Sequence, residues 1–288
     1  MGRAAAPPPL RVGVDVGGTK LLLAARVADG VHVQRAATGA ATRPDGLECA
    51  IRDFLAGLGA PVAALGVAVP GLVGGRGEVV ACDVLPRLVG WEPAAAFADL
   101  GCAVCVLNDA EAALREETHD LPPGATAGVV LAGTAVGAAF LVDGQPLRGA
   151  RGWAGELGYL PLPTADGVKR LDELAGGAWL AARLGTDGAG LAARVGRGDA
   201  AALEAVAAGG AALGLGLAAV VNLLNPELLA VGGGTSTLPG YFESAVRSAE
   251  AHSLPELWRV CTLRRARGGA ALVALGAARA AAADSRSA

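Results

Sequence analysis

The chain has 288 residues, of which 53% are hydrophobic and 18% are charged, and its formal net charge is −3. This length and composition exclude a disordered chain and allow either one large domain or two lobes. The slightly acidic balance provides no basic surface, so we do not expect nucleic acid as a partner.

The cysteines and the first residues of the chain indicate a reducing compartment. The five cysteines are odd in number and scattered, and residues 1–9 are rich in Ala and Pro without the apolar run of a secretory signal. We therefore expect reduced thiols and a cytoplasmic protein. Cys102 and Cys105 have the C-x-x-C spacing of redox proteins, but they lead into an apolar run, and we interpret both as strand or pre-strand cysteines.

Apolar runs typical of strands alternate with helical patterns along the whole chain. The expected strands are residues 11–16, 21–27, 31–37, 64–69, 104–107, 127–132, 136–142, 228–231 and 260–263. The expected helices are residues 45–58, 93–100, 109–117, 171–184, 200–224, 241–252 and 270–283. This alternation predicts an α/β fold with mixed sheets.

One segment has the length and composition of a membrane span. Residues 205–226 carry no charge, which meets the length criterion for a spanning helix. The segment is rich in Gly and Ala and contains two Asn residues, so we interpret it as a buried helix and expect no membrane association.

The first expected strand leads Asp15 into a Gly-Gly-Thr turn, and a second strand follows directly. Gly17 and Gly18 allow a backbone with φ > 0, whose N–H groups can approach phosphate oxygens. Thr19 adds a hydroxyl donor, and Lys20 follows it. Asp15 can hold a magnesium ion through water. The segment therefore predicts a phosphate-binding hairpin.

A second Gly-Thr turn, formed by Gly133 and Thr134, joins two strands in the second half of the chain. The repetition predicts a duplicated fold with two phosphate-binding turns. We expect an N-terminal lobe of residues 1–107 and a C-terminal lobe of residues 108–288. The last helix, residues 270–283, is expected to pack back on the N-terminal lobe.

Three further segments carry polar groups or glycines directly after expected strands or loops. Asn108 and Asp109 join a strand to a helix, where either side chain can act as the N-cap. A carboxylate at the carboxyl end of a strand is also where a general base belongs. Glu156 lies between glycines in a region poor in charge. The triple glycine 232–234 follows a strand and suits the close approach of a nucleotide.

Taken in order, these segments resemble the ROK family of sugar kinases, which share their fold with hexokinase, actin and the Hsp70 ATPase. The resemblance implies a two-lobed, duplicated actin-like ATPase (ribonuclease H-like) fold with a cleft between the lobes. It also implies a glucokinase-like enzyme that uses ATP with Mg²⁺ and forms a homodimer. The matching segments are residues 15–20, 69–71, 85–91, 108–110, 133–134, 149–158 and 232–234.

The resemblance also implies a role for each matching residue. Asp109 matches the catalytic base, which takes a proton from a sugar hydroxyl, expected to be the 6-hydroxyl. Asn108 and Glu156 match sugar ligands. The residues implied in nucleotide and phosphate binding are Asp15, Gly17, Gly18, Thr19, Lys20, Gly133, Thr134, Gly232, Gly233 and Gly234, and Asp15 is also the implied Mg²⁺ residue.

The chain departs from the family pattern in two connected places. Most ROK sugar kinases carry a His followed by a cysteine-rich zinc motif, whereas this chain has Tyr159 and no cysteine in residues 160–171, so we expect no zinc site. A downstream sugar-binding Glu of the family aligns with Asp172 or, with a one-residue shift, with Glu173. We therefore predict Tyr159 and Asp172 as substrate-binding residues.

These two departures keep alternative functions open. Both concern the anomeric end of the sugar, so a kinase of an aminosugar such as kanosamine, or of a C7 cyclitol, is the first alternative. A non-catalytic, sugar-sensing ROK protein is the second. The repressors of the family carry an N-terminal helix-turn-helix, for which residues 1–10 are too few, and we do not expect DNA binding. The phosphate donor, ATP or polyphosphate, also stays open. Ala135 and Ala138 make the second turn poorer in glycine than is usual in the family, so either the turn is slightly different or nucleotide binding is weaker.

Overall fold

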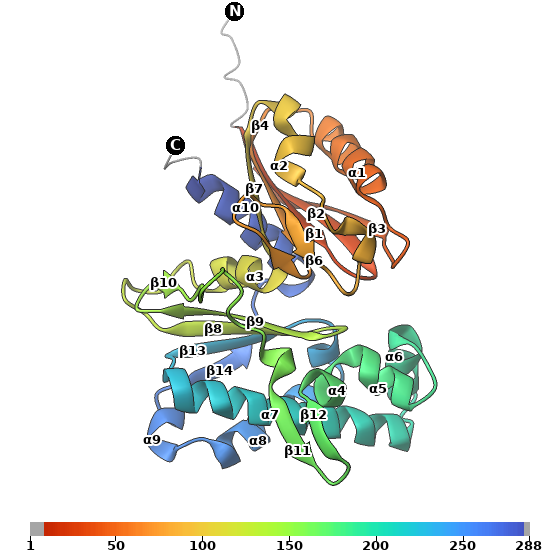
Figure 1. The fold of residues 1–288 in the computed structure, drawn as a ribbon, viewed down its shortest axis with the longest axis vertical. Helices are drawn as coiled ribbons and strands as arrows, with labels where there is room; N and C mark the ends of the chain where they lie inside the picture. The colour runs from red at the N-terminus through yellow and green to blue at the C-terminus, as the bar shows by residue number, and fades with distance from the viewer. Residues whose placement is uncertain (1–8, 285–288) are drawn as a thin grey trace, which may run out of the picture. The chain divides into compact units, whose positions relative to one another are not determined.

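The computed structural model describes residues 9–284, which form two compact units (Figure 1). Among these residues, unit 1 contains 9–119, 149–153 and 268–284, and unit 2 contains 120–148 and 154–267. The predicted boundary after residue 107 differs from this division, because the helix that follows it belongs to unit 1. Most of the segment 1–9, on which the expected lack of a signal sequence rests, lies outside the described residues.

Unit 1 is built on a five-stranded mixed sheet with the strand order β3-β2-β1-β4-β7. The first three strands form an antiparallel meander, and β1, β4 and β7 are parallel. The carboxyl ends of the three parallel strands therefore meet at one edge of the sheet. The strands are β1 (Leu10–Val16), β2 (Lys20–Val27), β3 (Gly30–Ala37), β4 (Val62–Val69) and β7 (Ala103–Asn108).

Unit 2 repeats this topology with the strand order β10-β9-β8-β13-β14. Here too a meander comes first, and β8, β13 and β14 are parallel. The predicted α/β class and the mixed sheets are thus confirmed. The strands are β8 (Ala127–Ala132), β9 (Val136–Val142), β10 (Gln145–Pro146), β13 (Leu228–Gly232) and β14 (Thr262–Arg265).

The helices are α1 (Pro44–Gly57), α2 (Pro93–Ala96), α3 (Asp109–Glu117), α4 (Asp172–Ala175), α5 (Gly177–Arg183), α6 (Gly188–Gly196), α7 (Ala200–Leu224), α8 (Tyr241–His252), α9 (Pro255–Trp258) and α10 (Leu272–Asp284). Two small hairpins pair β5 (Leu72–Val73) with β6 (Val79–Ala81) and β11 (Pro161–Thr164) with β12 (Gly167–Arg170). Neither the hairpins nor α6 and α9 were predicted, because such short elements show little periodicity.

Two sequence expectations need correction. The helix expected at residues 171–184 is broken at Gly176, whose backbone is extended between α4 and α5. The last strand begins at Thr262 rather than at residue 260, because Cys261 still donates its N–H to the carbonyl of Leu257 at the end of α9.

α10 packs closely on the sheet of unit 1 and on α3 because small residues line the contact. A Cβ at Gly13 of β1 would overlap the carbonyl oxygen of Ala274 in α10. A Cβ at Gly276 of α10 would likewise overlap the carbonyl oxygen of Ala112 in α3. These glycines allow the backbones to lie in direct contact, so the C-terminal helix is an integral part of unit 1.

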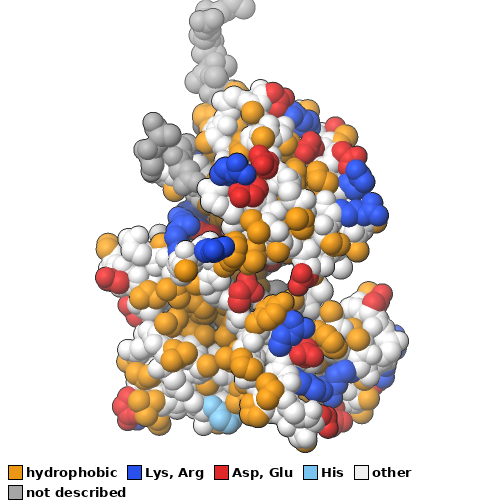
Figure 2. Space-filling model, in the orientation of Figure 1, with side chains coloured by type: hydrophobic (Ala, Val, Ile, Leu, Met, Phe, Trp, Pro, Cys, Tyr) orange, Lys and Arg blue, Asp and Glu red, His pale blue; other side chains and the backbone are white. Residues whose placement is uncertain are grey.

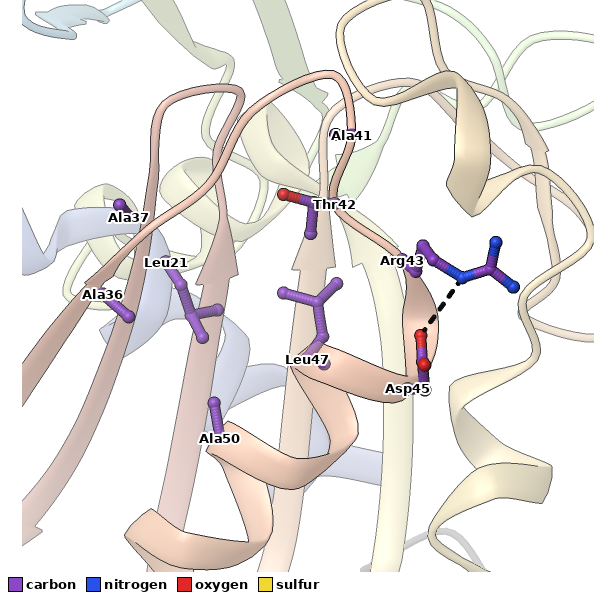
Figure 3. A pocket seen from close by; sticks show the side chains of 10 residues that line it. Leu21, Ala36, Ala37, Ala41, Thr42, Arg43, Asp45, Leu47 and Ala50 are labelled. Carbon is purple, nitrogen blue, oxygen red and sulfur yellow. Dashed lines mark ion pairs between the residues drawn. The ribbon is translucent and has the colours of Figure 1, made fainter.

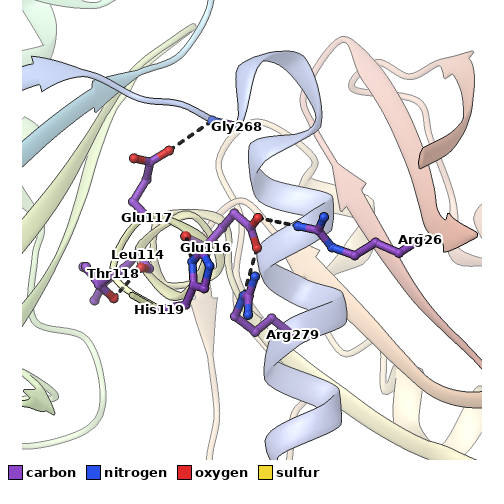
Figure 4. Close-up of polar contacts among 8 residues, drawn as sticks. All are labelled: Arg26, Leu114, Glu116, Glu117, Thr118, His119, Gly268 and Arg279. Atoms are coloured by element: carbon purple, nitrogen blue, oxygen red, sulfur yellow. Dashed lines mark hydrogen bonds and ion pairs between the residues drawn. The ribbon is translucent and has the colours of Figure 1, made fainter. Parts of the chain in front are cut away.

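Charged groups at the end of α3 add to this packing (Figure 4). The carboxylate of Glu116 accepts hydrogen bonds from Arg26 of β2 and, at 3.0 Å, from Nε of Arg279 in α10. The neighbouring Glu117 is 2% exposed, and its Oε1 accepts the N–H of Gly268 at 3.1 Å. α3 is thereby fixed to the C-terminal segment by both neighbouring carboxylates.

α7 is the one helix among residues 9–284 that is long and apolar enough, by length and composition, to cross a membrane. In unit 2 it packs along α8, and a Cβ at Gly210 would overlap the backbone of Tyr241. Leu213, Leu217 and Val221 on this helix are fully buried. This is the packing of a core helix, as the sequence indicated.

The cysteine spacing does not form a redox pair. Cys102 packs in the apolar cluster that contains Phe97, whereas Cys105 packs against the cluster that contains Leu107. Cys102 precedes β7 and Cys105 lies within it, and the two side chains pack in different apolar clusters. Neither forms a disulfide.

Candidate active site

In unit 1, the candidate residues gather where the parallel strands end. Asp15 of β1 is in register with Ala68 of β4, and Asn108 of β7 is in register with Val69. Asp15 and Asn108 therefore flank the end of β4 on its two sides. The carbonyl oxygen of Gly71, just beyond β4, accepts a hydrogen bond of 2.9 Å from Nδ2 of Asn108.

Asp15 is a buried carboxylate with a second carboxylate near it. The side chain is 8% exposed. Burial raises the pKa of Asp15 to about 7, the charge of Asp109 adds to this rise, and Lys20 opposes it. Carboxylate oxygens are the ligands that Mg²⁺ prefers. A cation beside Asp15 would offset the unfavourable burial of this charge, so the residues present fit the expected Mg²⁺.

The described residues contain no group of three or more His, Cys, Asp or Glu side chains that could hold a metal ion. This donor set matches the usual behaviour of Mg²⁺, which keeps several water ligands and binds through one or two carboxylates together with substrate phosphates. A Mg²⁺ ion at Asp15 would depend on such outside ligands.

Asn108, rather than Asp109, is the N-cap of α3. Oδ1 of Asn108 accepts the N–H of Ala110 at 2.8 Å, while Nδ2 of the same side chain donates to the carbonyl oxygen of Gly71. Asp109 is the first residue of the helix, and its Oδ1 also lies 2.8 Å from the N–H of Ala110. A carboxylate in the first turn of a helix interacts favourably with the positive end of the helix dipole.

The first Gly-Thr turn offers free N–H donors. The carbonyls of Gly17 and Thr19 accept hydrogen bonds from the side chain and the N–H of Thr38, at 2.6 and 3.2 Å. Gly17 donates its N–H to Lys20. Within residues 9–284, the N–H groups of Gly18 and Thr19 have no protein acceptor. The turn can therefore donate these two groups to a phosphate.

The expected positive φ at this turn was wrong, because neither Gly17 nor Gly18 has a left-handed backbone. Gly17 is needed for another reason. A Cβ at this position would lie 2.9 Å from the carbonyl oxygen of Lys20, which is too close for a side chain. The hairpin therefore needs the missing Cβ for close approach and not for a special backbone angle.

The second turn, in unit 2, is one residue tighter, but its carbonyls also accept hydrogen bonds from a neighbouring segment. The carbonyl of Gly133 accepts the N–H of Gly177 at 2.9 Å, and that of Thr134 accepts the N–H of Ala178 at 3.0 Å. Gly133 donates its own N–H to Ala135 at 3.0 Å. In the described part of the chain, the N–H groups of Thr134 and Ala135 have no protein acceptor. Both hairpins thus present two neighbouring free donors.

The break at Gly176 explains how this turn is held. It creates a new helix N-terminus at α5, and the first N–H groups of a helix have no partner within the helix. Those of Gly177 and Ala178 are satisfied by the carbonyls of the turn. A continuous helix over residues 171–184 would leave no free donors there.

The triple glycine joins the second turn through Thr235, which the sequence analysis missed. Thr235 is buried, and its hydroxyl donates to the carbonyl of Gly133 at 2.7 Å. Gly232 ends β13, and Gly233 has a φ of +89°, where a Cβ would overlap the carbonyl of Ala132. Thr235 directly follows Gly234, so its place after the triple glycine could have suggested this role. No local signal in the sequence indicates that Thr38 holds the carbonyls of the first turn.

Three of the residues expected to bind the acceptor, Glu156, Tyr159 and Asp172, lie in unit 2. Glu156 is exposed just before a 3₁₀ turn, Leu157–Tyr159. Tyr159 is 51% exposed, and the guanidinium carbon of Arg170 lies 4.8 Å from the centre of its ring. Asp172 is half-buried, and its Oδ1 accepts the N–H of Val136 at 2.6 Å. Burial is the main cause that raises the pKa of Asp172.

A cavity of about 400 Å³ lies elsewhere in unit 1, between the β2–β3 hairpin and the start of α1 (Figure 3). It contains none of the predicted site residues, and its lining is mostly Ala and Leu. The lining residues are Leu21, Ala36, Ala37, Ala41, Thr42, Arg43, Asp45, Gly46, Leu47 and Ala50.

On the face seen in Figure 2, Lys and Arg side chains lie among Asp and Glu side chains.

The sequence model of the ROK family matches residues 11–283. Among curated proteins, the bifunctional enzyme NanE/NanK of Brucella suis biovar 1 is 27% identical over 162 residues, which cover 54% of this chain and 31% of that protein. The match thus spans less than a third of that relative.

Solved structures cover nearly the whole chain. A ROK hexokinase from Thermus thermophilus is 26% identical, with a TM-score of 0.77, over 97% of this chain and 100% of that one. A ROK family glucokinase from Streptomyces griseus, in complex with glucose and AMPPNP, is 23% identical, with a TM-score of 0.79, over 95% and 99%.

Proposed function

The chain belongs to the ROK family, and on this premise we propose that it is an ATP-dependent sugar kinase. It transfers the γ-phosphoryl group of ATP to a hydroxyl, the 6-hydroxyl in our proposal, of a hexose or a hexose-like sugar. The observation that carries the proposal is the pair of Gly-Thr hairpin turns, each with two carbonyls that accept hydrogen bonds and two free N–H donors, in a chain that also has a carboxylate at the start of α3.

The proposed reaction asks little covalent chemistry of the protein. Asp109 accepts the proton of the acceptor hydroxyl while the hydroxyl oxygen attacks the γ-phosphorus. The bond from that phosphorus to the β,γ-bridging oxygen breaks and releases ADP. Positioning and charge stabilisation supply most of the rate in such transfers. The N–H groups of Gly18, Thr19, Thr134 and Ala135 are suited to the phosphate oxygens.

Mg²⁺, when bound, would neutralise phosphate charge, and Asp15 would hold it through water. Lys20 contributes a positive charge near the same carboxylate. Gly232, Gly233 and Gly234 are proposed to line the adenosine side, where the absence of side chains allows close approach. No zinc takes part in this proposal.

The acceptor is proposed to bind through Asn108, Glu156 and Tyr159. Amide and carboxylate groups suit sugar hydroxyls, which both donate and accept hydrogen bonds. A second candidate acceptor, an aminosugar such as kanosamine or a C7 cyclitol, is favoured by one observation. Tyr159 places a half-exposed phenol ring, with Arg170 over it, where the family has an imidazole.

The test measures ADP release with Mg²⁺ and ATP against glucose, mannose, N-acetylmannosamine, fructose, kanosamine and a C7 cyclitol. We expect acceptor-dependent turnover on at least one of them, and the preferred acceptor decides between the two candidates. A parallel assay with polyphosphate identifies the donor. Sugar binding without turnover on any acceptor would contradict the kinase and favour a sugar-sensing protein.

We propose in addition that the enzyme is cytoplasmic, as its scattered cysteines indicate, and that it forms a homodimer, as the family resemblance implies. Light scattering of the purified protein, with the mass compared with twice that of the 288-residue chain, tests the second point. A monomeric mass over the whole concentration range would contradict it.

A further inference from the structure

We propose that Asp172 is a positioning residue that holds the second phosphate turn in place, rather than a ligand of the acceptor. The inference rests on the proposed kinase function and changes the role that the sequence indicated for this residue. It assigns Asp172 to nucleotide affinity.

The first step is the contact itself. Oδ1 of Asp172 accepts the N–H of Val136 at 2.6 Å, and Val136 is the first residue of β9, directly after the Gly133–Ala135 turn. Val136 is 4% exposed, so water does not compete freely for this hydrogen bond. A hydrogen bond between an ionised carboxylate and a backbone N–H is among the stronger hydrogen bonds in proteins.

The second step is the packing that brings the carboxylate there. Gly158 is buried against Asp172, and a Cβ at Gly158 would lie 2.7 Å from Oδ1 of Asp172. The same Cβ would lie 2.5 Å from the carbonyl oxygen of Val136. The segment that carries Glu156 and Tyr159 can therefore lie directly on both groups. The carboxylate of Asp172 therefore lies between the segment that carries Glu156 and Tyr159 and the end of the Gly133–Ala135 turn.

The third step separates Asp172 from the acid beside it. Oε2 of Glu173 accepts the N–H of Arg170 at 2.9 Å and lies 3.4 Å from its Nε. Glu173 therefore connects α4 to the end of β12. Asp172 contacts the residue that follows the phosphate-binding turn. The two neighbouring acids have different partners.

The fourth step is the consequence for the turn. Its carbonyl side is fixed by Gly177, Ala178 and Thr235, while the Val136 N–H is fixed by Asp172. Without the carboxylate, the end of the turn next to β9 loses its polar anchor. The free N–H groups of Thr134 and Ala135 would then be less well ordered for a phosphate, and nucleotide affinity should fall.

The experiment measures the dissociation constant of AMPPNP with Mg²⁺ by calorimetry, without acceptor, for Asp172→Ala and Asp172→Asn. The loss of a hydrogen bond to a charged group corresponds to about 10-fold or more in affinity. We expect that weakening for the Ala variant. The Asn variant keeps an oxygen that can accept the Val136 N–H, and it should stay within about 3-fold of the wild type.

Asp187→Ala is the matched control. Oδ1 of Asp187 accepts the N–H of Gly190 at 2.7 Å as the N-cap of α6, so this variant also removes a carboxylate from a backbone N–H in unit 2. It should lower the melting temperature without changing the affinity for AMPPNP. Melting curves of all variants separate a local effect from general unfolding.

Two results would overturn the inference. In one, Asp172→Ala binds AMPPNP as tightly as the wild type. In the other, Asp172→Asn binds AMPPNP normally but raises the KM of the acceptor about 10-fold. That result would show that the carboxylate contacts the acceptor, whatever the Ala variant does. Failure of the proposed function looks different, because the wild type itself would then show no acceptor-dependent release of ADP from ATP with Mg²⁺.

Discussion

Asp15 and Asp109 lie at the same edge of the unit 1 sheet, and the negative charge of Asp109 adds to burial in raising the pKa of Asp15 to about 7. Two carboxylates are thus held near each other in surroundings that disfavour a second negative charge. Such an arrangement is unfavourable for folding but useful for binding a cation. Function and stability should therefore respond oppositely to changes at Asp15.

The first prediction is that Asp15→Asn stabilises the ligand-free protein at neutral pH. Because the folded-state pKa is about 7 and the ordinary value is 3.8, the folded protein binds the proton more tightly. Wild-type stability should fall as the pH rises from about 4 to about 7 and should then level off. The full shift corresponds to up to ~4 kcal/mol.

Urea unfolding at pH 4.5 and pH 8 in Mg²⁺-free buffer measures this effect. The gain of Asp15→Asn over the wild type should be larger at pH 8, and Asp29→Asn, which removes an exposed carboxylate in the β2–β3 turn, serves as the control. An equal gain at both pH values would show that Asp15 is ionised in the folded protein throughout.

The second prediction concerns Asp109 as the proposed base. Asp109→Asn should lower kcat by about 10²- to 10⁴-fold, the usual contribution of a general base, because an amide cannot take the hydroxyl proton. The affinity for AMPPNP should change little. Steady-state kinetics on the preferred acceptor, together with calorimetry, measure the two quantities separately.

Glu111→Gln on the same helix is the control, since Glu111 lies in the first turn of α3 and pairs with Arg115 at 3.5 Å. It should keep normal kcat. If Asp109→Asn kept more than a tenth of the wild-type kcat, another group would have to accept the proton.

The sequence predicted the regular elements of the fold well, and the reasons are physical. β8, β9, α3, α7 and α8 have the predicted bounds, because long apolar runs and complete helical periods define them. The two Gly-Thr turns also fall where predicted, between paired strands.

What the sequence missed depends on contacts between distant segments. The helix break at Gly176 falls on a Gly-Gly pair, a local signal that the expected helix overlooked, and its structural reason becomes visible only when α5 meets the carbonyls of Gly133 and Thr134. Thr235 and Gly133 are 102 residues apart. The partner of Asp172 is likewise set by folding, because Val136 lies 36 residues before it.

The third prediction is that the protein folds without zinc. Residues 160–171 contain no cysteine, and the described residues hold no group of three metal-binding side chains. Metal analysis of the purified protein should find no stoichiometric zinc. A zinc chelator should leave the melting temperature unchanged, whereas EDTA should abolish turnover until Mg²⁺ is added. One zinc per chain, with unfolding on chelation, would contradict the prediction.

The fourth prediction tests the contact between the C-terminal helix and the unit 1 sheet. Gly13→Ala should lower the free energy of unfolding by about 1–3 kcal/mol, the usual effect of overpacking a core. The reason is that the new Cβ would overlap the carbonyl oxygen of Ala274, a backbone atom that no side-chain rotation can move. Urea unfolding curves of the two proteins measure the difference.

Gly46→Ala is the matched control, because a Cβ at this position in α1 has open space around it. Replacing a helical glycine by alanine without steric conflict should stabilise the protein by about 0.5–1 kcal/mol, through the lower entropy of the unfolded chain. The two glycine substitutions should therefore have opposite signs. If both stabilised the protein, α10 would have to lie farther from β1 than the close contact at Gly13 implies.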